Sequence, residues 1–164
     1  MMMKILLSFV LLFVLFACES PGDEGKTLNY LTYQEDYVIE TFRSEPTGAY
    51  EGRQEIKAIG SIEELETYYQ EHKDSYDLSS FKAYIETLDE RRFEDSALLI
   101  IVLEEPSGSI HHGVKDLFMK NGTLMVELYR DVPEIGTTDM ACWHILLEVS
   151  KTNHAFDDIE LYVE

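Results

Sequence analysis

The stretch Ala97-Leu98-Leu99-Ile100-Ile101-Val102-Leu103 decides the fold of this chain of 164 residues. It is an unbroken run of apolar residues, and most of its side chains are branched. Such a run is typical of a central strand that is buried on both faces. We therefore take residues 97–103 as the centre of the predicted domain and assign the other elements around it.

Six further strands are predicted on the two sides of this run, from β-branched and aromatic content or from a period of two. They cover residues 37–42, 54–59, 112–120, 123–130, 143–150 and 159–163. In the strand over 143–150, alternation places four apolar side chains on one face: Trp143, Ile145, Leu147 and Val149.

Two helices are predicted in the first half of the chain. Ser61 and Glu64 form a capping box, which starts a helix that ends near Lys73. The second helix starts at Ser79 or Ser80 and carries one apolar stripe, made of Phe81, Tyr84, Ile85 and Leu88. Because hairpins dominate the second half, we predict an α+β domain with a mainly antiparallel sheet of about seven strands. The sheet would be curled into a sandwich or a partial barrel.

The dipeptide Asn121-Gly122 predicts a two-residue hairpin loop between the strands 112–120 and 123–130. A loop of this length makes Lys120 face Thr123 and fixes the register of the other pairs. One face should meet the core, with the pairs Met119–Leu124, Leu117–Val126 and Lys115–Leu128. The opposite face carries the pairs Phe118–Met125, Asp116–Glu127, Val114–Tyr129 and His112–Asp131.

Asp116 opposite Glu127 is an unusual pair, because like charges directly opposite each other destabilise a sheet. One interpretation is a cation or amine site formed by Asp116 and Glu127, with His112 or Asp131 as further ligands. Carboxylates suit calcium, and an added histidine would suit zinc. In the alternative interpretation, both carboxylates point into water or pair with nearby lysine or arginine. No other cofactor is predicted.

Two further sets of residues were considered for catalysis. Cys142 and His144 share a strand face opposite to Trp143, and we expect Cys142 to be a buried, unreactive thiol. Glu104 and Glu105 precede a turn and are the candidate carboxylates of a hydrolase, although an acidic chain offers many such pairs by chance.

The first 18 residues have the pattern of an export signal. Lys4 precedes an apolar run over residues 5–17, which is shorter than the about 20 residues needed to span a bilayer. The end of the run, Leu15-Phe16-Ala17-Cys18, resembles the lipobox of bacterial lipoproteins. The resemblance implies cleavage after Ala17, lipidation of Cys18, and a position outside the cytoplasm on a membrane.

This resemblance divides the chain into three parts: a signal peptide over residues 1–17, a lipidated cysteine with a flexible tether over 18–28, and one globular domain over 29–164. Cleavage would leave Cys142 as the one remaining cysteine besides Cys18. Two alternatives stay open, an uncleaved helical anchor and secretion with a free Cys18.

The charge of the chain excludes one class of partner. Its formal net charge is −19, and removal of the signal, which carries Lys4 and no acid, makes it −20. A surface this acidic repels phosphate backbones, so we expect no nucleic-acid binding. Cationic partners, metal ions or a basic protein surface remain possible, and acidity can also serve solubility alone.

Two loops are the candidate binding surface, because loops on a rigid sheet often carry binding residues. The first covers residues 106–112 and includes Ser107, Gly108 and Ser109. The second covers residues 132–141, just before Trp143, the only tryptophan, and includes Thr138 and Asp139.

The segment 93–151 resembles the C-terminal domain of PrcB-type subunits of exported protease complexes. The order of a buried strand, a small-residue turn at Ser107-Gly108-Ser109-Ile110, a hairpin and a final strand carries the resemblance. It implies a non-catalytic accessory domain that associates with another exported protein. The leading hypothesis is therefore a lipid-anchored, extracytoplasmic binding domain. Its rivals are a cation-binding envelope protein and an envelope hydrolase that uses carboxylates or a metal.

Overall fold

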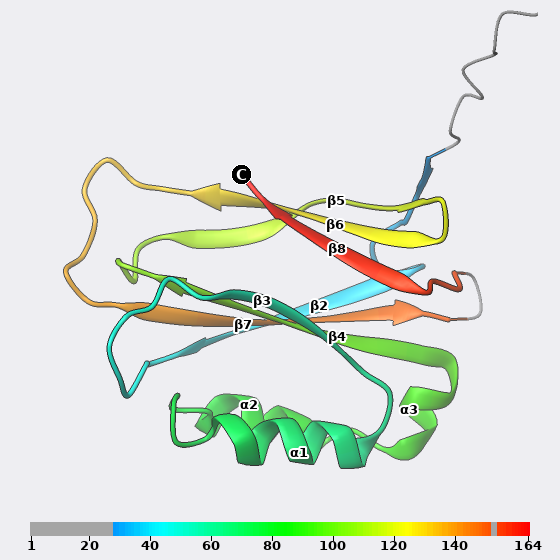
Figure 1. The fold of residues 1–164 in the computed structure, drawn as a ribbon, viewed down its shortest axis with the longest axis horizontal. Helices are drawn as coiled ribbons and strands as arrows, with labels where there is room; N and C mark the ends of the chain where they lie inside the picture. The colour runs from blue at the N-terminus through cyan, green and yellow to red at the C-terminus, as the bar shows by residue number, and fades with distance from the viewer. Residues whose placement is uncertain (1–27, 152–153) are drawn as a thin grey trace, which may run out of the picture.

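Two four-stranded β-sheets face each other, and helices lie against one of them, on the side that faces away from the other sheet (Figure 1). The computed structural model describes residues 28–151 and 154–164. The predicted signal and Cys18 lie outside the described residues. We call the sheet that contacts the helices the inner sheet and the other the outer sheet.

Strands of the inner sheet are all antiparallel and follow the order β2-β7-β4-β3. Their bounds are Tyr37–Ser44 for β2, Ala141–Ser150 for β7, Ser96–Glu105 for β4 and Gln54–Ile59 for β3. The outer sheet follows the order β1-β5-β6-β8. Its bounds are Asn29–Tyr30 for β1, His111–Lys120 for β5, Thr123–Asp131 for β6 and Asp158–Val163 for β8. The pairing of β6 with β8 is parallel.

Strand β4 is buried on both faces, which confirms the interpretation of residues 97–103. Its odd-numbered side chains join the core between the two sheets, together with Ile145 and Leu147 of β7. Its even-numbered side chains join a second core beneath the helices, which includes Phe81 of α2 and Leu146 of β7. The two cores therefore meet at the plane of the inner sheet.

Three helices cover this second core: α1 (Ile62–His72), α2 (Ser79–Ile85) and α3 (Glu90–Asp95). The Ser61 hydroxyl accepts from the Glu64 amide at 3.2 Å, as the capping box predicts. The Glu64 carboxylate instead accepts from the Gly60 amide, at 2.7 Å. Helix α3 was not predicted; Asp89 caps it, and Phe93 anchors it in the second core.

The predicted hairpin register holds from Lys120 back to Asp116 and then fails. A β-bulge between Val114 and Asp116 shifts every earlier pair by one residue. Lys115 therefore becomes exposed, and Val114 takes the place opposite Leu128 and packs on the core. The physical reason is the cost of burying an unpaired ammonium group, which a regular register would have placed in the core.

The bulge also corrects the predicted pair His112–Asp131. His112 faces Arg130, and His111 faces Asp131. The α+β class and the mainly antiparallel pairing are confirmed. Within the described residues the strands form two separate four-stranded sheets and no closed barrel, which agrees with the sandwich alternative.

Candidate binding site

The two predicted loops meet at one end of the sandwich, which we call the loop end (residues 106–110 and 132–140). Gly108 donates its amide to the Asp139 carbonyl at 2.8 Å. The Thr137 amide donates to the Ser109 hydroxyl at 3.1 Å. These bonds bring together two segments about 30 residues apart in the sequence.

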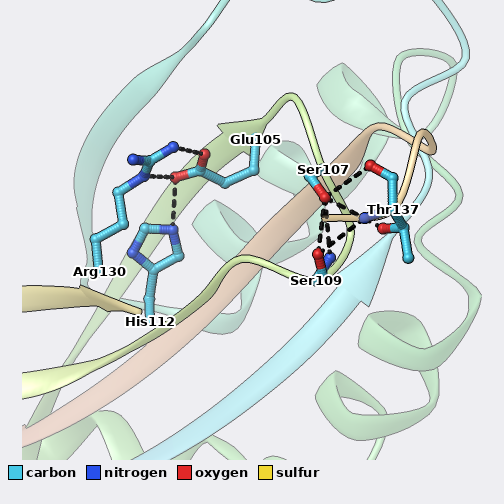
Figure 2. Close-up of polar contacts among 6 residues, drawn as sticks. All are labelled: Glu105, Ser107, Ser109, His112, Arg130 and Thr137. Atoms are coloured by element: carbon cyan, nitrogen blue, oxygen red, sulfur yellow. Dashed lines mark hydrogen bonds and ion pairs between the residues drawn. The ribbon is translucent and has the colours of Figure 1, made fainter. Parts of the chain in front are cut away.

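Ser107 is the centre of the polar contacts in the loop end (Figure 2). Its hydroxyl donates to the Thr137 carbonyl at 2.8 Å and lies 2.8 Å from the Ser109 hydroxyl. The sequence predicted Ser107 and Ser109 but not Thr137. Thr138, which was predicted, is exposed. The sequence pattern does not indicate which of the two adjacent threonines, Thr137 or Thr138, contacts Ser107.

Gly108 lies close to the ends of two charged side chains, which would have to shift if this residue carried a Cβ atom. A Cβ at this position would lie 2.4 Å from an Asp139 carboxylate oxygen and 2.6 Å from an Arg43 guanidinium nitrogen. Arg43 and Asp139 form an ion pair directly over the turn. Hydrogen bonds from Thr137 and Arg43 lower the pKa of Asp139 to about 2, so this carboxylate is ionised at neutral pH.

The β6–β7 loop is exposed along its whole length from residue 132 to residue 140. Ile135 has 88 % of its surface exposed, and Val132 and Met140 are also exposed apolar side chains. Exposed apolar side chains gathered on one loop are candidates for contact with another protein.

Trp143 does not belong to this surface, which corrects its predicted role. The side chain lies in β7, is only 9 % exposed and forms part of the core between the sheets. Its ring contacts the His111 ring with a centroid distance of 5.2 Å. Its position immediately after the loop suggested a binding role, but its register on β7 directs it inward.

A buried carboxylate lies beside the loop end. Glu105, at the end of β4, accepts two hydrogen bonds from Arg130, at 2.7 and 2.6 Å, and one from His112 at 2.8 Å (Figure 2). The side chains of Glu105 and His112 are almost completely buried. The bulge in β5 produces this cluster, because it turns His112 toward the inner sheet.

Burial opposes ionisation of Glu105, but the hydrogen bonds from Arg130 and His112 and the charge of Arg130 outweigh it and lower the pKa of Glu105. Burial also lowers the pKa of His112, against the attraction of Glu105. The Nδ1 atom of His112 has no hydrogen-bond partner within the described residues. We therefore assign a neutral His112 that donates through Nε2, and the cluster is an ionic support for the loop end.

The four residues predicted as a metal site are not brought together. His112 is committed to Glu105, and Asp131 lies opposite His111. Asp116 does face Glu127, as predicted. Within the described residues, no group of three or more His, Cys, Asp or Glu side chains is placed to hold a metal ion.

Glu104 and Glu105 do not form a carboxylate pair across a cleft, because adjacent residues of a strand point to opposite faces. Glu104 accepts from the Tyr76 hydroxyl at 2.8 Å and from the amides of Glu51 and Arg53. Burial opposes its ionisation, but these bonds lower its pKa. Glu104 and Tyr76 line a small polar cleft of about 230 Å³ next to the β2–β3 connection.

Cys142 is buried, as predicted, and faces the second core with His144. Burial raises the pKa of the Cys142 thiol to about 12 and lowers the pKa of His144 to about 3. The Nδ1 atom of His144 lies 2.8 Å from the Ser44 hydroxyl and 3.9 Å from the Cys142 sulfur. A protonated thiol beside a neutral imidazole in a closed core is a poor nucleophile.

Comparison with protein-family models, with curated proteins and with solved structures finds no match for this chain. Among residues 28–151 and 154–164, every helix is too short or too polar to cross a membrane. The functional argument therefore starts from the loop end itself.

Replacing Arg130 should destabilise the fold, because it leaves the buried Glu105 carboxylate without its main compensation. We expect Arg130→Met to reduce the free energy of unfolding by about 3 kcal/mol, because Glu105 would stay buried without its main counter-charge. The measurement is urea denaturation at pH 7. Lys115→Met, which breaks the exposed pair with Glu164, is the control and should cost less than about 1 kcal/mol. Adding Glu105→Gln to Arg130→Met should restore stability; a further loss would contradict this account.

Acid should destabilise the fold through its buried histidines. Between pH 6.5 and 5 an unfolded chain protonates His144, whereas the folded chain, with a pKa of about 3 at that site, does not. The unfolded state then binds more protons, so the free energy of unfolding falls as pH falls, by up to about 1.4 kcal/mol per pH unit for each such histidine. We expect His144→Gln to flatten this slope in urea denaturation at several pH values. The exposed His111→Gln should keep it, and equal slopes in both variants would refute the assignment.

Proposed function

We propose that this chain is a lipid-anchored, extracytoplasmic binding domain that engages another exported protein through its loop end. The observation that carries the proposal is the loop 132–140, which exposes apolar side chains and is anchored at Thr137 and Asp139 by Ser107, Ser109 and Arg43. A loop that is ordered before binding loses less conformational entropy on association. The ion pair beneath it and the buried Glu105 cluster support the same rigidity.

The states of the buried ionisable groups favour binding over hydrolysis. A general acid needs a raised pKa and a nucleophilic thiol a lowered one. The pKa shifts of Glu104, Glu105 and Cys142 run in the opposite directions. All three groups are buried, and each carboxylate already accepts at least three hydrogen bonds. They serve the fold rather than a reaction.

The remaining support comes from the sequence. The lipobox-like segment at Cys18 implies a lipid anchor, and the likeness of residues 93–151 to PrcB-type subunits implies an accessory role beside another exported protein. The loop also carries Glu134 and Asp139 around its apolar side chains, and Asp131 ends β6 directly before it. A partner surface with an apolar pocket and a basic rim would complement it.

Ile135→Asp should abolish partner binding and leave the fold intact, because Ile135 is exposed and would anchor the interface. A photo-crosslinking amino acid at position 134 should capture one exported protein in cells, identified by mass spectrometry, and Ile135→Asp should remove that product. Leu28→Asp changes an exposed apolar residue outside the loop end and is the control. Capture that is unaffected by Ile135→Asp, or equal from position 63 of α1, would contradict the proposal.

Cys18→Ser should release the protein from the membrane, because a lipidated cysteine with at least two acyl chains is what holds it there. Cell fractionation should find the wild type in the membrane fraction and the variant in the soluble extracytoplasmic fraction. Mass spectrometry of the wild-type protein should find an acylated Cys18 as the first residue. A retained leader, or an unmodified thiol on membrane-bound protein, would refute the anchor.

A further inference from the structure

In the described part of the chain, the outward side of the outer sheet carries no helix, in contrast to the inner sheet, which the helices cover (Figure 1), although Phe118 and Met125 on this side are buried. Alternation along the strands directs six charged or aromatic side chains outward from β1, β5, β6 and β8. We call them the acidic–aromatic face: Tyr30, Asp116, Glu127, Tyr129, Glu160 and Tyr162.

The register places these side chains in neighbouring rows. Asp116 faces Glu127, and Glu127 faces Tyr162 on the other side. In the next row Met125 faces Glu160. The Tyr162 hydroxyl donates to the Glu160 carboxylate at 2.6 Å. Three carboxylates and a tyrosine ring therefore lie on adjacent positions on one side of the sheet.

Two of these carboxylates have no direct contact with a counter-charge. Within the described residues, neither Asp116 nor Glu127 accepts a hydrogen bond or forms an ion pair. Lys115 stands beside them on β5. Its ammonium group pairs with Glu164 at 2.5 Å, which is the main cause of its raised pKa, and the charges of Glu127 and Asp116 add to that rise. The like-charge pair lowers the stability of the sheet, and a bound cation would relieve this repulsion.

Aromatic rings flank the carboxylates and are open to solvent. Tyr30 is 58 % exposed, and Tyr129 and Tyr162 are each 48 % exposed. The Tyr129 ring lies against the backbone of Gly113, its cross-strand partner, where a Cβ atom would come within 2.5 Å of the ring. Rings presented in this way attract lysine or arginine through cation–π contacts.

We propose that the acidic–aromatic face binds a basic segment of a protein, with a lysine or arginine side chain placed between Asp116, Glu127 and the Tyr162 ring. Charge complementarity selects this occupant. A second copy of the chain carries the same large negative charge and would be repelled, as would an anionic lipid surface. The inference does not rest on the proposed function, because no residue of the face belongs to the loop end.

The test measures binding of a fluorescein-labelled octa-arginine peptide to the full-length protein in neutral detergent, by fluorescence anisotropy at 0.15 M salt. We expect Asp116→Asn with Glu127→Gln to raise Kd about fivefold or more. The reason is that the variant removes the ion pairs that a bound arginine would form with these two carboxylates beside the tyrosine rings. The matched control is Glu63→Gln with Glu94→Gln, which removes the same charge from exposed positions on α1 and α3. It should raise Kd less than about twofold, as expected for distant screened charges.

Two further measurements separate the proposal from its alternatives. Tyr162→Leu should weaken peptide binding about threefold while Tyr162→Phe retains it, because the ring supplies the cation–π contact. The double variant at 116 and 127 should melt about 1–4 °C higher than the wild type, since it removes a repulsion. That rise would show that lost binding is not lost folding.

Equal weakening in the two double variants would overturn the proposal, because it would show general attraction between opposite charges. A divalent cation would be assigned to the face instead if two results came together. Calcium at 1 mM would raise the melting temperature of the wild type but not of the double variant, and both proteins would bind the peptide equally. A failure to capture a partner through the loop end would not change the peptide binding measured here. The proposal for the acidic–aromatic face and the proposed function can therefore fail independently.

Discussion

The burial of β4 on both faces is the constraint on which the rest of the structure depends. Its apolar side chains must leave water on two sides, and each fully buried leucine or isoleucine contributes about 1.5–3 kcal/mol when it does so. One side requires a second sheet, and the other requires helices. The outer sheet and helices α1, α2 and α3 meet these requirements and create two separate cores. The strand ends where this double cover ends, at Glu104 and Glu105, and each carboxylate turns to a different set of donors.

The bulge at Lys115 links the hairpin to the loop end. A regular hairpin from Asn121-Gly122 would direct the Lys115 ammonium group into the core, and the one-residue shift avoids that cost. The same shift turns His112 toward the inner sheet, where it meets Glu105 beside Arg130. The position of Lys115 on β5 therefore determines where the Glu105 cluster forms, and this cluster lies beside the loop end. It also leaves Asp116 and Glu127 facing each other on the outside.

Much of the fold could be predicted from local sequence patterns, because apolar runs, capping boxes and Asn-Gly turns act within a few residues. The bulge could not be predicted in this way. It depends on whether burying the Lys115 ammonium group would cost more free energy than shifting the register of the remaining strand pairs. For the candidate site, the two loops and Ser107, Ser109 and Asp139 were predicted. The contacts of Arg43 and the Glu105 cluster join residues from distant strands, so no local spacing could indicate them. For Trp143 there were two indications in the sequence: alternation along its strand placed it on the apolar face, which the structure confirms, whereas its position beside a loop suggested a binding role, which its burial does not support.

The distribution of carboxylates separates those that serve the fold from those that do not. Glu104 and Glu105 are buried, and arginine, tyrosine or backbone donors compensate each of them. Asp116 and Glu127 oppose each other on an open sheet, and asparagine or threonine there would give a more stable strand pair. Inside the fold, only the neighbouring charge of Lys115 is shown to offset this repulsion, and a like-charge pair so weakly compensated is most simply explained by an interaction outside the fold. By this argument the acidic–aromatic face, rather than the general acidity of the chain, is where a cationic partner should bind.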